Sequence, residues 1–420
     1  MSVLKALPLR YRLPLIHGTL GLIGKWRARN WLTADNTRLR KGPIIVSAFY
    51  NEAIGIGRGG QLTADAIAAA GYDIIRHDLR PCFGHIRDQK AQLPGENAGV
   101  WLIHANAPEA LVALISHSPD QWSQRYRIGF WAWETPKAPD DWVWLAALFH
   151  EIWVPSRFVR DALATAFHSQ NRSELCLRLR VMPHPFPPKA TATTPQRERF
   201  GLKSGLCHTL TLFDSKSSAA RKNPWAALEA WQKAFPEPSD TACLTIKIQG
   251  LSDDPQTRSR LETMIGDRQD MRLFTERLSD ADMDSFVASF DIVLSLHRSE
   301  GFGLSLLEAM MSGIPVIATG WSGNTDFMTA DNSRTVGYSL IPIDDRHGAY
   351  SALKPDPAQV WADANTDDAA QALRELCSDA ERRRILGTEA RKVAARVNAP
   401  WSHQALYASL TPWDTPPKPL

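Results

Sequence analysis

Two glutamates flank a short glycine-bearing segment in the second half of the chain. Glu300 and Glu308 are separated by seven residues, where the pattern predicts a strand over 291–297, a loop, and a helix over 304–312. The intervening loop residues are Gly301, Phe302 and Gly303. Glycines let backbone N–H groups approach a ligand, and a helix N-terminus adds free donors. Two carboxylates there could bind sugar hydroxyls; alternatively, both could simply favour the helix dipole.

Two cations stand immediately before the next candidate helix, which the pattern predicts over 224–235. Arg221 and Lys222 are followed by Asn223, a favourable N-cap residue, and by Pro224, a favourable first helical residue. Fixed cations at a helix N-terminus would bind a diphosphate. A phosphate that leaves in a transfer reaction gains negative charge, and such a site would stabilise it. An ordinary basic helix start is the alternative.

Three polar residues follow predicted strands in the first half of the chain. Glu134 comes after a strand over 127–131, and Asn51 and Glu52 come after a strand over 44–49. Glu134 could position or deprotonate an acceptor hydroxyl, and the other two are further candidates on the acceptor side. Hydrogen bonding or ion pairing within the loops is the alternative for each.

Residues 55–60 match the pattern GxGxxG, with Asp78 at about dinucleotide-binding distance. A nicotinamide-dependent oxidoreductase is therefore an alternative function. Five residues, 50–54, separate the strand from the glycines, whereas a dinucleotide fingerprint begins almost at the strand end. We instead expect a long glycine loop before a helix over 62–70, and this loop would touch a diphosphate across a cleft. Its ligand-facing residues would be Gly57, Gly59 and Gly60.

The sequence predicts neither a metal site nor a cofactor. Three aspartates form overlapping DxD patterns, but they lie at the start of an amphipathic helix over 279–290, where Ser279 and Asp282 suit a capping box. The five cysteines lack CxxC spacing, which argues against a zinc site or disulfide framework and fits a reducing cytoplasm. The aspartates are Asp280, Asp282 and Asp284.

The elements that must position these residues form two series of alternating strands and helices. The candidate segments all follow strands, and open α/β sheets bind ligands beyond the carboxyl ends of their strands. Four prolines in 181–189 separate the two series. We predict a basic extension over 1–41, domains over 42–183 and 189–398, a proline-rich linker over 184–188, and a C-terminal helix and tail over 399–420.

The segment from Ser299 to Phe327 resembles the retaining glycosyltransferases of family 4, whose signature is E-x7-E. The resemblance covers most of residues 43–330 and includes HRSEGFG (297–303), RKNP (221–224), GFWAWETP (129–136) and EIWVPSRFV (151–159). It implies the GT-B fold, in which two Rossmann-like doubly wound domains face a central cleft. The C-terminal helix would pack back on the first domain.

The resemblance also implies an activity: transfer of a hexose from a nucleotide-diphosphate sugar, with retention of configuration, to a saccharide or lipid-linked saccharide. Glu300 would then bind the donor sugar near the reacting carbon, and Glu308 would bind the nucleotide ribose. Asp326 stands where relatives often have a glutamate, and Ser322 replaces a glycine before it. Relatives build bacterial surface polysaccharides such as lipopolysaccharide. A catalytically silent sugar-nucleotide-binding subunit is a second alternative.

Charge is concentrated at the N-terminus. Residues 1–41 hold nine basic residues and one acid, a net charge of +8, whereas the whole chain carries +3. This basic leader with leucines and tryptophans suggests peripheral attachment to an anionic membrane on its inner, cytoplasmic face; a solvated extension is the alternative. Pro8, Pro14 and Gly18 favour a hooked or partly helical segment over one long helix. The acidic remainder argues against nucleic acid as a partner.

Overall fold

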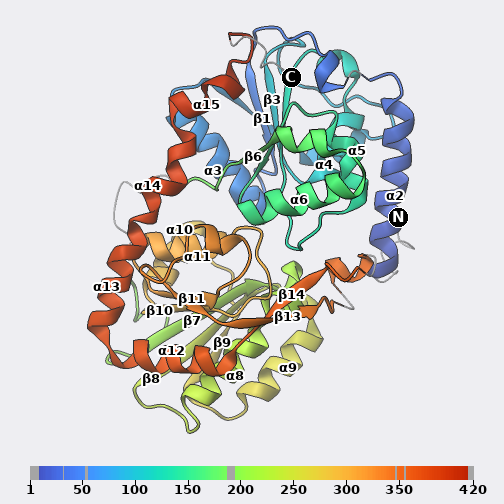
Figure 1. The fold of residues 1–420 in the computed structure, drawn as a ribbon. Helices are drawn as coiled ribbons and strands as arrows, with labels where there is room; N and C mark the ends of the chain where they lie inside the picture. The colour runs from blue at the N-terminus through green and yellow to red at the C-terminus, as the bar shows by residue number, and fades with distance from the viewer. Residues whose placement is uncertain are drawn as a thin grey trace. The chain divides into compact units, whose positions relative to one another are not determined.

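The computed structural model describes residues 9–31, 33–52, 55–186, 194–345, 348–353 and 356–414. The described residues form two compact units: 11–186 and 396–414 belong to the first, and 9–10 and the described residues of 194–395 belong to the second. Each unit contains a six-stranded sheet (Figure 1). Within the described ranges, no helix combines the length and the apolar character needed to cross a membrane.

The first unit is built on a parallel sheet in the order β2-β1-β3-β4-β5-β6. Its strands are β1 (Ile44–Ala48), β2 (Ile74–Asp78), β3 (Val100–His104), β4 (Tyr126–Phe130), β5 (Glu151–Val154) and β6 (Leu179–Val181). Its main helices are α2 (Leu9–Ala28), α3 (Gly55–Ala69), α4 (Ala107–Ser116), α5 (Val143–Ala146), α6 (Arg157–Ser169) and α15 (His403–Leu410).

Both faces of this sheet are buried. Ile45 and Trp101 belong to a core cluster with residues of α4 and α6, whereas Val46 and Leu102 belong to another with α3 and α15. Successive side chains of a strand point to opposite faces, so a sheet covered on both faces requires continuous apolar strands. The apolar runs in the sequence therefore predicted the sheet correctly.

Helix α15 packs on the sheet of the first unit. Leu406 and Leu410 are fully buried in the core cluster shared with α3. Arg180, on β6, donates to the carbonyl of Ala405 at 2.5 Å, and the hydroxyl of Tyr72 donates to the carbonyl of His403 at 3.0 Å. The chain therefore returns to its first sheet after completing the second unit (Figure 1).

Helix α2 corrects one prediction, because it continues through Pro14 and Gly18 as a single helix. The proline removes one backbone hydrogen bond near the helix N-terminus, and packing along the rest of the helix stabilises it. A Cβ on Gly24 would lie 2.7 Å from Leu111, so α2 and α4 are in close contact. Arg27 also donates to the carbonyl of Ile115 at 2.5 Å. Pro8 lies outside the described residues.

Helix α3 corrects a second prediction. It begins at Gly55, so residues 55–60 form its first turns rather than a loop before it. A Cβ on Gly60 would meet the Cβ of Ala48 at 2.4 Å, and one on Gly57 would meet the carbonyl oxygen of Phe49 at 2.7 Å. These glycines allow the helix to lie against the end of β1, so the requirement for glycine has a packing explanation.

The second unit has a parallel sheet in the order β12-β11-β10-β7-β8-β9. Its strands are β7 (Cys207–Asp214), β8 (Ala242–Gln249), β9 (Met271–Phe274), β10 (Ile292–Ser295), β11 (Val316–Thr319) and β12 (Arg334–Val336). The main helices are α7 (Ala219–Lys222), α8 (Pro224–Ala234), α9 (Pro255–Ile265), α10 (Asp280–Ala288), α11 (Leu304–Met311), α12 (Thr366–Ser378), α13 (Ala380–Arg391) and α14 (Val393–Asn398). An antiparallel pair, β13 (Tyr338–Pro342) and β14 (Val360–Ala364), was not predicted.

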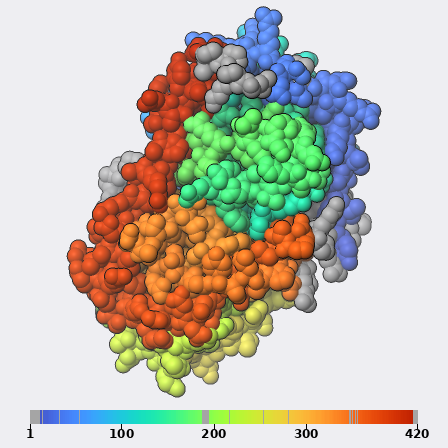
Figure 2. Space-filling view, in the orientation of Figure 1, coloured from blue at the N-terminus to red at the C-terminus, as the bar shows by residue number. Residues whose placement is uncertain are grey.

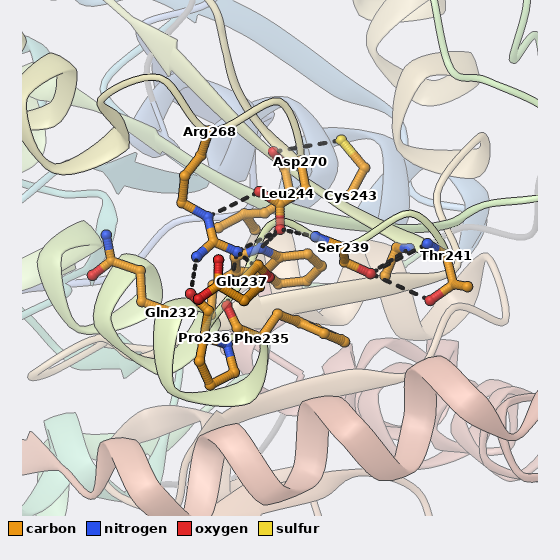
Figure 3. Close-up of polar contacts among 12 residues, drawn as sticks. Gln232, Phe235, Pro236, Glu237, Ser239, Thr241, Cys243, Leu244, Arg268 and Asp270 are labelled. Atoms are coloured by element: carbon orange, nitrogen blue, oxygen red, sulfur yellow. Dashed lines mark hydrogen bonds and ion pairs between the residues drawn. The ribbon is translucent and has the colours of Figure 1, made fainter.

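A buried carboxylate links α8 to the start of β9 (Figure 3). Asp270 is 2% exposed, pairs with Arg268 through both oxygens at 2.7 and 2.9 Å, and accepts the indole N–H of Trp231 at 2.9 Å. Burial alone would raise the pKa of Asp270, but these partners outweigh it and lower the pKa. Both carboxylate oxygens accept hydrogen bonds from protein groups, so we assign this network a structural role.

Candidate functional site

The strand order of the second unit reverses between β7 and β10. Strands β8 and β9 follow β7 on one side, whereas β10, β11 and β12 extend on the other. At such a switch point the loops after the two central strands diverge and leave a crevice beyond the sheet edge. The segments after β7 and β10 contain Arg221, Lys222 and Glu300, so topology brings the two principal sequence motifs to one place.

The segment after β7 holds its two cations rigidly. Ser218, at a positive φ of 67°, accepts the backbone N–H of Arg221 at 3.2 Å and caps the short helix α7. The Arg221 guanidinium is buried and donates to the carbonyls of Ser299 at 2.7 Å and Ser217 at 3.2 Å. Arg221 therefore links the two loops, in addition to any contact with a ligand.

Asn223 has a different role from the one predicted. It lies in the left-handed region, and its side chain donates to the carbonyl of Leu296 at 3.1 Å instead of capping α8. Short polar side chains tolerate this conformation because they can hydrogen-bond locally. Pro224 occupies the first turn of α8, as predicted.

Glu300 lies between the two cations. Lys222 Nζ donates to Glu300 Oε1, and Arg221 Nη1 lies 3.4 Å from Glu300 Oε2. Burial alone would raise the pKa of Glu300, but the charges of Lys222 and Arg221 dominate and lower it to about 2. The carboxylate is therefore ionised at every physiological pH.

The loop that carries Glu300 is supported from the turn after β11. Ser322 Oγ accepts the Glu300 N–H at 2.8 Å, and the Gly323 N–H donates to the Glu300 carbonyl at 2.9 Å. A Cβ on Gly323 would lie 2.2 Å from the carbonyl oxygen of Gly301, so only glycine allows this approach. Ser322 has a φ of 77° and supplies a hydroxyl that a glycine there could not. Its departure from the family pattern therefore has a structural use.

A buried histidine completes the support. His297 Nε2 lies 3.1 Å from Asn324 Oδ1, and its carbonyl accepts the hydroxyl of Thr319 at 2.7 Å. Burial lowers the pKa of His297, so the ring is neutral at physiological pH. His297 and Asn324 lie within the family motifs, but their supporting role was not predicted because only the fold brings the two loops into contact.

The other candidates of the second unit lie on adjoining elements. Glu308 is the fifth residue of α11, half-buried and beyond the first turn, so the helix dipole does not account for it. Gly303 caps α11 at a φ of 94°. Phe302 is buried and packs against Phe327, with ring centroids 5.0 Å apart. Asp326 is half-buried at the end of the 3-10 helix Gly323–Asp326.

In the first unit, Asn51 and Glu52 interact with residues at and just beyond the end of β2. Asn51 donates to Asp78 at 2.6 Å, and Glu52 forms an ion pair with Arg80. These contacts agree with the alternative of bonding within the loops. Glu134 is half-buried in the segment after β4. It belongs to the first unit, whereas Glu300 belongs to the second.

The nicotinamide alternative conflicts with the structure at residues 55–60. A dinucleotide fingerprint forms the tight turn between strand and helix, but these glycines lie inside α3. Gly59 lies against two imidazole rings, because a Cβ there would lie 2.7 Å from His184 and 2.9 Å from His104.

The DxD pattern begins α10 as predicted, with Ser279 accepting the N–H of Asp282 at 3.2 Å.

The profile of a known protein family matches residues 162–406, more than half of the chain. That family is described as "Family 4 Glycosyltransferase in conflict systems". The chain belongs to this family. The match includes α7, β10 and α11, and so contains Arg221, Lys222, Glu300 and Glu308 of this glycosyltransferase.

Two curated relatives match shorter segments of the glycosyltransferase. Sulfoquinovosyl transferase of Arabidopsis thaliana is 30% identical over 120 residues, which are 29% of this chain. The GtfA subunit of the UDP-N-acetylglucosamine–peptide N-acetylglucosaminyltransferase of Streptococcus gordonii is 35% identical over 106 residues, or 25% of this chain. In both cases the match spans only 19% of the relative's length.

Solved structures share the fold of the glycosyltransferase over most of its length. Sucrose-phosphate synthase from Thermosynechococcus elongatus has a TM-score of 0.60 at 15% identity, with 89% of this chain and 98% of that one covered. Anabaena HepE in complex with UDP and glucose has a TM-score of 0.57 at 12% identity, with 88% and 99% covered. The fold is therefore GT-B.

Proposed function

We propose that this glycosyltransferase moves a hexose from a nucleotide-diphosphate sugar to a saccharide or lipid-linked saccharide, retains the anomeric configuration, and uses no metal ion. The observation that carries the proposal is the cluster of Arg221, Lys222 and Glu300 at the switch point of the second unit. HepE, which has the same fold, has been solved with UDP-glucose.

The cluster suits a donor that carries both negative charge and hydroxyl groups. Without a ligand, Glu300 neutralises Lys222, as a diphosphate would. A bound diphosphate would take over the lysine, and the carboxylate would then be available to accept hydrogen bonds from the donor sugar. Lys222 would also stabilise the charge that develops on the departing phosphate. These two cations would therefore supply the stabilisation that a divalent ion provides in other transferases.

Retention is proposed from the E-x7-E signature. The described side chains around Glu300 do not place a carboxylate as an evident covalent nucleophile, since Glu300 itself is held by both cations. We favour attack of the acceptor hydroxyl on the face from which the phosphate leaves, with the phosphate oxygen accepting the proton. Glu134 and the loop residues Asn51 and Glu52 remain candidates for contact with the acceptor.

Donor identification is the decisive experiment. The full chain would be heated with a panel of nucleotide-diphosphate sugars, because a ligand that binds only the folded state raises the unfolding temperature. The best donor would then be used with saccharide and lipid-linked acceptors, and NMR would assign the new glycosidic linkage. An inverted product would contradict retention, and the absence of stabilisation by every nucleotide sugar would contradict the donor site.

Helix α2 supports a second proposal, peripheral attachment to an anionic membrane. Among the described residues, its exposed large apolar side chains include Ile16, which is 38% exposed. Four others follow the spacing i, i+4, i+11 and i+15, which places them on one face of a helix. They are Tyr11, Leu15, Leu22 and Trp26. Leu22 and Trp26 are 73% and 66% exposed, and Lys25 and Arg29 are also exposed. Figure 2 shows part of the N-terminal segment, in blue, at the surface. The leader residues Leu4 and Leu7 lie outside the described residues.

A further inference from the structure

Three potential metal ligands converge in the first unit and take no part in the donor cluster. His77 lies on β2, Cys82 lies in the 3-10 helix Arg80–His85, and His117 immediately follows α4. One ligand atom from each side chain lies within 4.8 Å of those of the other two. His117 and Cys82 are buried and His77 is half-buried, so the group is largely screened from solvent.

His117 offers a free lone pair to the centre of this group. Its Nδ1 lies 2.7 Å from the carbonyl oxygen of Ala113, which can only accept, so Nδ1 carries the proton. Its Nε2 is buried and, among the described residues, lacks a hydrogen bond of normal geometry, although the backbone of Gln92 is close enough to act on the ring. Burial lowers the pKa of His117 to about 4, which keeps the ring neutral. A buried polar atom without a partner calls for an explanation, and a metal ion bound at Nε2 would provide one.

His77 is oriented in the same manner. Its Nδ1 lies 2.8 Å from Ser47 Oγ, which also accepts the indole N–H of Trp101 at 2.8 Å. Ser47 Oγ can accept from Nδ1–H or donate to Nδ1, and the backbone of Gln92 also lies near the ring. In the tautomer with the proton on Nδ1, Nε2 presents its lone pair. Both imidazoles are then held through Nδ1 by an oxygen atom, which is how proteins orient histidines that bind metals through the other nitrogen.

We propose that His77, Cys82 and His117 bind one zinc ion that fastens β2, the segment after it and the end of α4 together. Two imidazoles and a thiol are the donor set that zinc prefers, and three protein ligands leave a fourth position for water. Zinc–ligand bonds of about 2.0–2.3 Å require the three atoms to approach to roughly 3–4 Å of one another. Zinc binding would therefore require side-chain movements of about 1 Å.

Uptake of the zinc ion would release one proton from Cys82. Burial raises the pKa of Cys82 to about 11, so the thiol is neutral without a cation beside it. Binding would deprotonate Cys82, form the zinc–sulfur bond, and release one proton to solvent. The ion would stabilise the first unit and would be separate from the Arg221, Lys222 and Glu300 cluster, so the proposal stands or falls independently of the donor site.

The test uses the full-length protein and measures bound metal directly. The protein would be loaded with zinc, desalted and analysed by elemental mass spectrometry, and we expect about one zinc ion per chain. Exchange for Co²⁺ should give the absorption of a thiolate–cobalt bond. Cys82→Ser should abolish that absorption, and His117→Ala should lower the metal content. Cys243→Ser, which alters a buried thiol of the second unit, should change neither.

A second measurement avoids variants that might not fold. Wild-type protein would be treated with an alkylating reagent with and without zinc, and the modified cysteines would be located by mass spectrometry. Zinc should slow alkylation of Cys82 at least tenfold and leave Cys243 unaffected. A zinc content well below one per chain after loading, cobalt uptake without the thiolate absorption, or equal alkylation of Cys82 in both samples would overturn the proposal.

Discussion

Lys222 Nζ donates to Glu300 Oε1 and so joins the end of α7 to the loop after β10. The two residues are 78 positions apart in sequence, and only the order of the strands brings them together. The residues proposed to bind the phosphate and the donor sugar therefore contact each other. A substitution of either residue should therefore affect the other.

We expect Lys222→Ala and Glu300→Gln to damage different steps of transfer. Glu300 would act near the reacting carbon, so its loss should mainly lower kcat. Lys222 would hold the phosphates in both the ground and transition states, so its loss should raise the donor KM and lower kcat. Each substitution should cost about 2–4 kcal/mol in transition-state stabilisation, as for other desolvated groups. Steady-state kinetics with the identified donor would measure both constants.

Two further variants complete this test. Lys392→Ala removes an exposed lysine that pairs with Glu389 on the surface, and it should leave kcat and KM unchanged. The double variant of Lys222 and Glu300 should lose less than the sum of the single variants, because the two side chains contact each other. Wild-type kinetics in either single variant would show that the donor site lies elsewhere.

Transfer should persist in EDTA. Arg221, Lys222 and the segment around α7 would provide the positive charge that a metal-dependent transferase takes from a divalent ion. The assay compares rates before and after chelation, followed by addition of Mg²⁺ or Mn²⁺. A loss of activity that either ion restores would contradict the prediction. Unfolding caused by loss of a buried zinc ion would be distinguishable, since Mg²⁺ would not reverse it.

The contribution of Glu300 to stability should depend on pH. Its pKa is about 2 in the folded protein, below the ordinary value of 4.5, so its stabilising effect is complete above about pH 4.5 and disappears as the pH falls towards 2. The full difference corresponds to about 3 kcal/mol. Urea unfolding of wild type and Glu300→Gln between pH 6 and pH 3 would measure it. We expect the gap between the two proteins to narrow on acidification, and a constant gap would count against the ion pair.

Two glycines of α3 provide a matched test of packing. Gly60→Ala should lower the free energy of unfolding by about 1–3 kcal/mol, because its Cβ would meet that of Ala48 at 2.4 Å. Gly55→Ala is the control, since nothing lies within 4 Å of its added Cβ and alanine favours helix. Thermal unfolding of both variants would decide. Equal effects at the two positions would refute the close approach of α3 to β1.

Membrane attachment should depend on the exposed face of α2. Leu22→Ser with Trp26→Ser should reduce co-sedimentation with anionic liposomes about tenfold, as expected for a loss of about 1.4 kcal/mol. Added salt should weaken binding of the wild type, and neutral liposomes should bind it poorly. Leu177→Ser is the control, since Leu177 is also highly exposed but lies outside α2.

These point substitutions are preferable to a variant that starts at Gly42. Deletion of α2 would uncover Leu111 and Trp144, which contact Gly24, and would remove the hydrogen bonds of Arg27. A loss of binding could then reflect damage to the first unit. Sedimentation of the double variant equal to that of wild type would rule out the exposed face as the attachment surface.

The sequence by itself determined the fold class and indicated the residues that we propose bind the donor. Apolar strands followed by helices predict doubly wound sheets, because only a sheet covered on both faces tolerates such strands. Arg221, Lys222 and Glu300 were recognisable because each follows a predicted strand and lies beside a glycine or a helix start. Charged residues have few structural reasons to recur at such positions. Patterns of this kind involve residues that are close in sequence, so they can be recognised without the tertiary structure.

The tertiary structure decided what depends on distant neighbours. Residues 55–60 read as a loop because glycine disfavours helix, yet contacts with Ala48 and His184 require small residues in that helix. Helix α2 continues through Pro14 because the surface of α4 holds it. The meeting of His77, Cys82 and His117 has no signature in sequence spacing. These features arise from packing between elements, and packing energies can outweigh the local propensities on which sequence patterns rest.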